Sequence, residues 1–96
     1  MTYKLTFLPI AKKEWDNLAE PIRKQFKNKL AERLKNPHVP AAKLKGYDAV
    51  YKIKLRKVGY RLVYEVLDRE IVITVLAVGR RDKNAIYKKL ASRSIF

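Results

Sequence analysis

The spacing of apolar residues changes near residue 50, and this change constrains the fold more than any other feature. Before it, apolar side chains recur every four residues, at Ile22, Phe26, Leu30 and Leu34. This spacing predicts a helix with one buried stripe. After it, apolar side chains recur at every second position in residues 50–56 and 60–67, which is the period of β-strands, and a third, almost entirely apolar segment follows. Helices followed by a run of strands favour the α+β class.

A strand and a short helix are predicted ahead of the long helix. Residues 2–8 alternate loosely between apolar and polar side chains, as a strand does. Pro9 is tolerated in the first turn of a helix, and apolar residues follow it at helical spacing, at Ala11, Trp15 and Leu18. Pro21 opens the long helix by the same logic, and Asn36-Pro37 ends it.

Three consecutive strands are predicted after residue 50, over residues 50–56, 60–67 and 70–78. Short turns join them, the second at Asp68-Arg69, so we expect an antiparallel meander. The third segment is almost entirely apolar, which indicates a strand buried on both faces. Gly79 is expected to end it.

A last helix is predicted from Lys83 to about Ser92, with Asp82 as its N-cap and Ile86 and Leu90 on its buried side. The expected order is β-α-α-β-β-β-α. We expect an antiparallel sheet packed against two N-terminal helices, with a C-terminal helix added. A length of 96 residues allows one domain, spanning residues 1–96.

The charge of the chain points to a polyanionic partner. Lys and Arg number 23 against 9 Asp and Glu, a net charge of +14. Both halves are basic, so the folded domain itself favours nucleic acid, with an anionic membrane surface or an acidic protein as alternatives. The absence of Cys and the single His38 disfavour disulfides, thiol nucleophiles and metal sites, and no cofactor is expected. No membrane span or signal peptide is apparent, so we expect a cytoplasmic protein.

The polar face of residues 50–56 is cationic, because it carries Lys52, Lys54 and Arg56. If the apolar faces pair across the following turn, Lys54 lies opposite Arg61. Like charges in that arrangement destabilise a sheet, so the pattern favours a bound anion. The alternative is a sheet face open to water, on which lysines prevent aggregation.

Further candidates lie at the end of the third strand, where Arg80 and Arg81 stand, and on the last helix, where Tyr87 stands. Cations beside an aromatic ring suit a single-stranded nucleic acid. Cleavage of RNA needs a base for the 2′-OH, positive charge for the transition state and an acid for the 5′-oxygen. Lys54 is the best-placed base, because neighbouring cations lower the pKa of a lysine. Glu65 and His38 are weaker acid–base candidates.

These segments resemble the RelE toxin family of bacterial type II toxin–antitoxin systems. The resemblance covers essentially the whole chain and is strongest in Tyr51-Lys52-Ile53-Lys54-Leu55-Arg56, Gly59-Tyr60-Arg61-Leu62-Val63-Tyr64, and Val78-Gly79-Arg80-Arg81 with Tyr87. It implies a ribosome-dependent mRNA endonuclease that cuts the codon in the 30S A site without metal. The 2′-OH attacks, which leaves a 2′,3′-cyclic phosphate and a 5′-OH.

The resemblance also implies residue roles. Lys52 and Lys54 match the family's catalytic lysines, with Lys54 as the base. Arg61 matches the arginine that stabilises the phosphate. Arg81 matches the arginine that stabilises or protonates the leaving group, and Tyr87 the tyrosine that stacks on the nucleotide. Contacts to RNA or the ribosome are expected from Lys43, Lys45, Arg56 and Arg80.

Partners and rival functions follow from the same resemblance. It implies a RelB-like antitoxin that neutralises the basic surface, and binding of operator DNA only through the toxin–antitoxin complex. A ParE-like inhibitor of DNA gyrase is one alternative, and the match at five residues argues against it: Lys52, Lys54, Arg61, Arg81 and Tyr87. A non-catalytic RNA-binding module is another. Relatives that use a carboxylate and a C-terminal His are disfavoured, because the end of this chain has no His.

Overall fold

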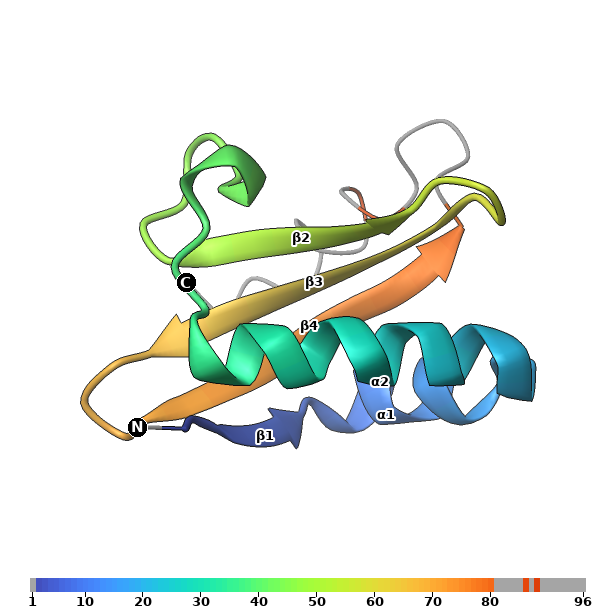
Figure 1. Ribbon diagram of the computed structural model, residues 1–96, viewed down its shortest axis with the longest axis horizontal. Coiled ribbons are helices and arrows are strands. Elements are labelled where there is room, and N and C mark those ends of the chain that lie inside the picture. The colour runs from blue at the N-terminus through green and yellow to red at the C-terminus, as the bar shows by residue number, and fades with distance from the viewer. Residues whose placement is uncertain (1, 81–85, 87, 89–96) are drawn as a thin grey trace.

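The computed structural model describes residues 2–80, 86 and 88 of the chain (Figure 1). The elements follow the predicted order as far as residue 80. They are β1 (Lys4–Phe7), α1 (Pro9–Asp16), α2 (Glu20–Lys35), the 3-10 helix η1 (Pro40–Ala42), β2 (Val50–Leu55), β3 (Tyr60–Leu67) and β4 (Val72–Arg80). Neither α-helix has the length and apolar character that crossing a bilayer requires, among the residues described.

The four strands form one sheet in the order β1-β4-β3-β2. The meander from β2 to β4 is antiparallel, as predicted. The expectation of a wholly antiparallel sheet is wrong, because β1 pairs parallel to β4. Because β4 is buried on both faces, its backbone N–H and C=O groups must be hydrogen-bonded along both edges. β3 pairs with one edge, and β1 pairs with the other. The sheet is therefore mixed.

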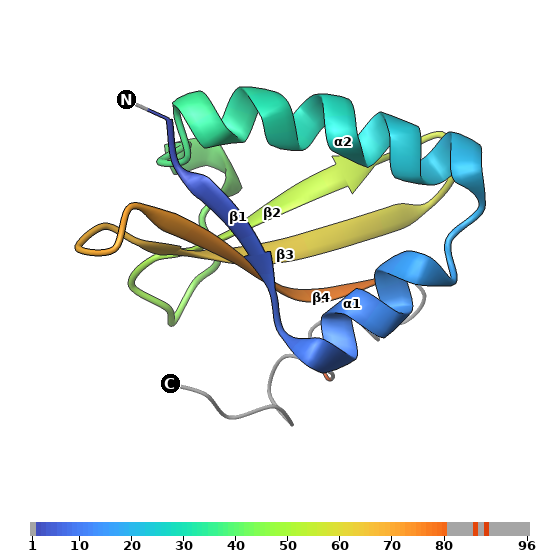
Figure 2. The same ribbon diagram turned by 90° about the horizontal axis from the view of Figure 1, so that it is seen from below.

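Helix α2 runs across one face of the sheet, and α1 continues along β4 beyond the end of β1 (Figures 1 and 2). Both helices contribute to one core. The Trp15 ring lies between Phe7 and Phe26, with ring centroids 5.3 and 6.3 Å away. Glu14 has a further role, because its Oε1 accepts a hydrogen bond from the Val78 backbone N–H at 3.1 Å. The carboxylate thus satisfies an edge of β4 that β1 does not reach.

The opposite face of the sheet carries a second cluster of buried side chains: Leu44, Val50, Val63, Leu76, Ala77 and Ile86. A bulge supports it, since the register shifts between Val63 and Tyr64 and places Leu76 and Ala77 together. Ile86 is fully buried, as its place on the predicted stripe requires. Apart from Ile86 and the exposed Lys88, the predicted C-terminal helix lies outside the described residues.

The boundaries of β4 differ from the prediction at both ends. The turn before it occupies residues 68–71 rather than two residues, and Ile71 adopts a φ of 56° that β-branched residues rarely take. The strand therefore begins at Val72 instead of residue 70. Gly79 does not end it, because Gly79 pairs with Arg61 and the strand continues to Arg80. Arg80 is therefore the last residue of β4 and not a residue that follows the strand.

Candidate functional site

Pairing of β2 with β3 builds a cationic face on the sheet. Lys54 lies directly opposite Arg61, and Lys52 opposite Val63, so the predicted register is confirmed. The alternate residues of β2, which are Tyr51, Ile53 and Leu55, are buried in the core beneath α2. Strand alternation therefore places the lysines and Arg61 on the other face of the sheet.

A groove of about 320 Å³ runs along β2, which is an edge strand. It is lined by Arg33, Val39, Ala41, Ala42, Lys52, Lys54 and Arg56. Four of these side chains are cationic and none is acidic. Such a groove attracts anionic groups, among them the phosphates of a nucleic-acid backbone.

The electrostatics of the groove act most strongly on Lys54. The neighbouring charge of Lys52 lowers the pKa of the Lys54 ammonium, and Arg61, partial desolvation and Arg56 lower it further. A lower pKa increases the fraction of neutral amine near neutral pH. More of Lys54 is therefore present as the neutral amine, the form that can act as a base, than of an ordinary surface lysine.

Arg33 connects α2 to the two strands beside the groove, a role that the sequence did not predict. Its Nη1 donates to the Lys52 backbone carbonyl at 3.2 Å and to the Tyr64 hydroxyl at 2.8 Å. That hydroxyl in turn donates to the Pro37 carbonyl at 2.8 Å. These bonds tie the end of α2 to the strand that carries the lysines. The available signal was helical spacing, because Arg33 stands three residues after Leu30 and so lies beside the apolar stripe.

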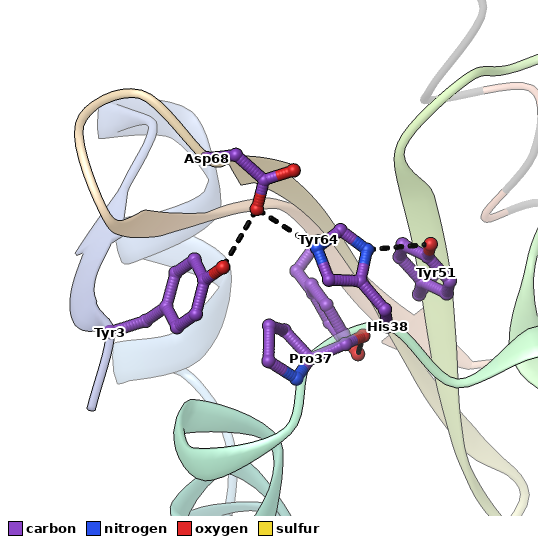
Figure 3. A network of polar contacts seen from close by, with 6 residues as sticks. All are labelled: Tyr3, Pro37, His38, Tyr51, Tyr64 and Asp68. Atoms are coloured by element: carbon purple, nitrogen blue, oxygen red, sulfur yellow. Dashed lines mark hydrogen bonds and ion pairs between the residues drawn. The ribbon is translucent and has the colours of Figure 1, made fainter. Parts of the chain in front are cut away.

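His38 belongs to a separate polar network (Figure 3). Its Nδ1 lies 3.0 Å from the Tyr51 hydroxyl and its Nε2 lies 2.8 Å from Oδ1 of Asp68. The Tyr3 hydroxyl donates to the same oxygen at 2.7 Å. The bonds from Tyr3 and then His38 lower the pKa of the Asp68 carboxyl. This network joins the residue before β1, the β3–β4 turn, the loop after α2 and β2.

The remaining candidate site residues do not all lie in the groove along β2. The Arg80 guanidinium lies over the Tyr60 ring, 5.6 Å from its centroid, and Tyr60 pairs with Arg80 across the sheet. Tyr60 is the residue next to Arg61 on β3. Because adjacent residues of a strand point to opposite faces, the side chains of Arg80 and Arg61 lie on opposite faces of the sheet. Lys43 and Lys45 line a second hollow that also includes Lys52. Two further candidates, Arg81 and Tyr87, lie outside the described residues.

The described residues contain no group of three or more His, Cys, Asp or Glu side chains that could hold a metal ion. The lining of the groove contains no carboxylate. Asp68 is bonded within its own network, and burial raises the pKa of Glu65. The chemistry that these residues offer is therefore that of amines and guanidinium groups.

Comparison with known proteins identifies the family of this chain. Residues 5–85 match the family described as the ParE toxin of type II toxin–antitoxin systems, parDE. The chain is 45% identical over 93 residues to the mRNA interferase toxin RelE of Escherichia coli K12, covering 97% of this chain and 98% of the relative. The chain belongs to the RelE/ParE toxin family. The mRNA interferase RelE of Shigella flexneri matches equally well, so this family member is a homologue of RelE mRNA interferases.

Solved structures of the family agree with this assignment. The free Escherichia coli RelE toxin, in a form with two arginines replaced by alanine, superposes with a TM-score of 0.90 at 43% identity, covering 99% of this chain and 100% of that one. The toxin in the intact Escherichia coli RelBE toxin–antitoxin complex gives a TM-score of 0.81 at 47% identity, over 84% of this chain and 99% of that one. The mixed sheet with β1 beside β4 is therefore the RelE-like fold.

Proposed function

We propose that this chain is a ribosome-dependent endoribonuclease toxin that cuts mRNA in the A site of the 30S subunit and so inhibits translation. The observation that carries the proposal is the cationic rung of Lys54 and Arg61 beside Lys52, in which the pKa of Lys54 is lowered. The 45% identity to RelE mRNA interferases supports the same activity. The groove along β2 has cations and no carboxylate in its lining, so it suits the mRNA that is cut.

The proposed reaction is transesterification within the RNA. The neutral amine of Lys54 takes the proton of the 2′-OH as the 2′-oxygen bonds to phosphorus. Lys52 and Arg61 stabilise the negative charge that develops on the phosphate oxygens. The bond from phosphorus to the 5′-oxygen breaks, which leaves a 2′,3′-cyclic phosphate and, after protonation, a 5′-OH. No metal or other cofactor is assigned to this reaction.

Two roles in the proposal rest on the family resemblance alone. Arg81 stabilises or protonates the leaving 5′-oxygen, and Tyr87 stacks on the nucleotide. Around them, contacts with the RNA or ribosome backbone are assigned to Lys43, Lys45, Arg56 and Arg80. The position of Arg80 on the Tyr60 ring favours an outer contact rather than one to the reacting phosphate.

The proposed partners follow from the charge and from the homologues. A RelB-like antitoxin would cover the basic surface, as the complex of Escherichia coli RelE with RelB suggests. Operator DNA would be bound only through that complex. The whole of residues 1–96 would act as one domain. Its place would be the cytoplasm, where translating ribosomes are found.

The experiment is single-turnover cleavage of mRNA positioned on purified ribosomes, with mapping of the product ends. We expect cuts within the A-site codon, products with 5′-OH and 2′,3′-cyclic phosphate ends, and far slower cleavage of naked RNA. A 2′-deoxy nucleotide at the cut should abolish the reaction, because the nucleophile is then missing. Intact mRNA together with gyrase-dependent DNA breaks would overturn the proposal in favour of the ParE-like activity. Ribosome binding without cleavage would leave an RNA-binding module.

A further inference from the structure

A second hollow lies beside the groove, and only Lys52 of its lining takes part in the reaction proposed above. Its volume is about 410 Å³, and its lining is Lys43, Leu44, Lys45, Tyr47 and Lys52. Lys52 also lines the groove along β2, so the two depressions meet at that side chain. Three of the five lining residues are lysines and none is acidic. The size is within the range of sites that hold small ligands.

The loop that forms this hollow is fixed to the edge of β2. Lys43 forms an isolated antiparallel bridge with Tyr51, and the Leu44 N–H donates to the Val50 carbonyl at 2.9 Å. The Leu44 side chain is only 8% exposed, because it packs into the second cluster. The flanking lysines, Lys43 and Lys45, remain exposed on either side of this anchor.

Tyr47 lines the hollow directly after a left-handed turn at Gly46. Gly46 has a φ of 86°, a conformation that glycine adopts without strain. The turn lets the Tyr47 ring pack against the second cluster while it still lines the hollow. The side chain is thus half-buried. An anchored aromatic ring keeps its orientation, and this lowers the entropic cost of stacking on it.

The charges around Tyr47 differ on its two sides. The hollow on one side contains three lysines. A smaller one of about 190 Å³ on the other side is lined in part by Asp48 and Glu65. A phosphate would therefore settle on the lysine side. Lysines that follow a backbone, next to an aromatic ring, are the combination by which proteins hold single-stranded nucleic acid.

We propose that this hollow is a second nucleotide subsite, in which a base of the bound mRNA stacks on Tyr47 and its phosphate contacts Lys43 and Lys45. The nucleotide is a neighbour of the one cut at Lys54, because both depressions share Lys52. The inference rests on the proposed function for the identity of the RNA, and it assigns Tyr47 to substrate binding rather than to bond cleavage.

The test measures binding and cleavage separately. Binding uses programmed ribosomes whose mRNA carries a 2′-deoxy nucleotide at the cut, so that nothing is cleaved. Tyr47→Leu keeps apolar packing but loses the aromatic face, and it should weaken binding roughly 5- to 150-fold, the range of one base–aromatic stack. Tyr47→Phe should bind like the wild type. Thermal unfolding of both variants reports whether the fold is kept.

A matched mRNA with an abasic residue next to the cut identifies the stacked base. On this mRNA the wild type should lose the same affinity, and Tyr47→Leu should cause little further loss. An undiminished Tyr47→Leu effect on abasic mRNA would overturn the proposal in favour of ribosomal RNA as the contact. Equal binding of Tyr47→Leu and wild type on intact mRNA would overturn it outright. Failure of the proposed function shows separately, as absence of cleavage by the wild type on all-ribose mRNA.

Discussion

Lys54 of β2 lies directly opposite Arg61 of β3, so two positive charges face each other across one rung of the sheet. Such a pair destabilises a sheet unless an anion lies between or above the charges. Lys52 adds a third charge and contributes most to the lowered pKa of Lys54. We therefore interpret this rung as a feature that serves function at the expense of stability.

Replacing Lys54 should separate activity from stability. In Lys54→Gln the base is lost, so single-turnover cleavage on programmed ribosomes should fall by about 10²- to 10⁴-fold. The melting temperature should stay the same or rise slightly, because the repulsion with Arg61 is relieved. Thermal unfolding and cleavage rates, measured on the same preparation, check this. Wild-type cleavage by Lys54→Gln would remove Lys54 from the reaction.

Tyr64 should be important for stability through its hydroxyl. The side chain is fully buried, and its hydroxyl accepts from Arg33 and donates to the Pro37 carbonyl. Tyr64→Phe leaves both partners without this contact and should reduce the free energy of unfolding by about 1–3 kcal/mol in urea titrations. The Arg33→Ala change should be less costly in the Tyr64→Phe background than in the wild type. Strict additivity of the two changes would show that the contact contributes nothing.

Asp68 should make stability depend on acid pH. Its folded-state pKa is lowered by hydrogen bonds from Tyr3 and His38. A lowered carboxyl pKa stabilises the fold above the unfolded-state pKa of about 3.9, and this contribution is lost as the pH falls through the folded-state pKa. Asp68→Asn should therefore be less stable than wild type at pH 7, with the difference shrinking below about pH 4. A difference that does not change with pH would contradict this assignment.

The features of the fold that could be predicted from the sequence are those that depend on the local pattern of apolar residues and turns. The pairing of Lys54 with Arg61 follows from strand alternation and one short turn. The parallel pairing of β1 with β4 has no such signal, because no turn joins these strands. Arg33 was missed because a cation on a helix usually faces solvent, whereas here it reaches Lys52 and Tyr64. Tyr47 was missed because its place depends on the left-handed turn at Gly46.

The most direct test of the central claim, that neighbouring cations prepare Lys54 to act as a base, is the pH dependence of single-turnover cleavage. The rate should rise with pH as the Lys54 ammonium loses its proton and level off above its pKa. Lys52→Ala removes the largest cause of the lowered pKa, so the rise should move to higher pH, whatever happens to the maximal rate. Lys27→Ala, which removes one exposed lysine of α2, should leave its position unchanged. A rise at the same pH in Lys52→Ala and wild type would contradict the claim.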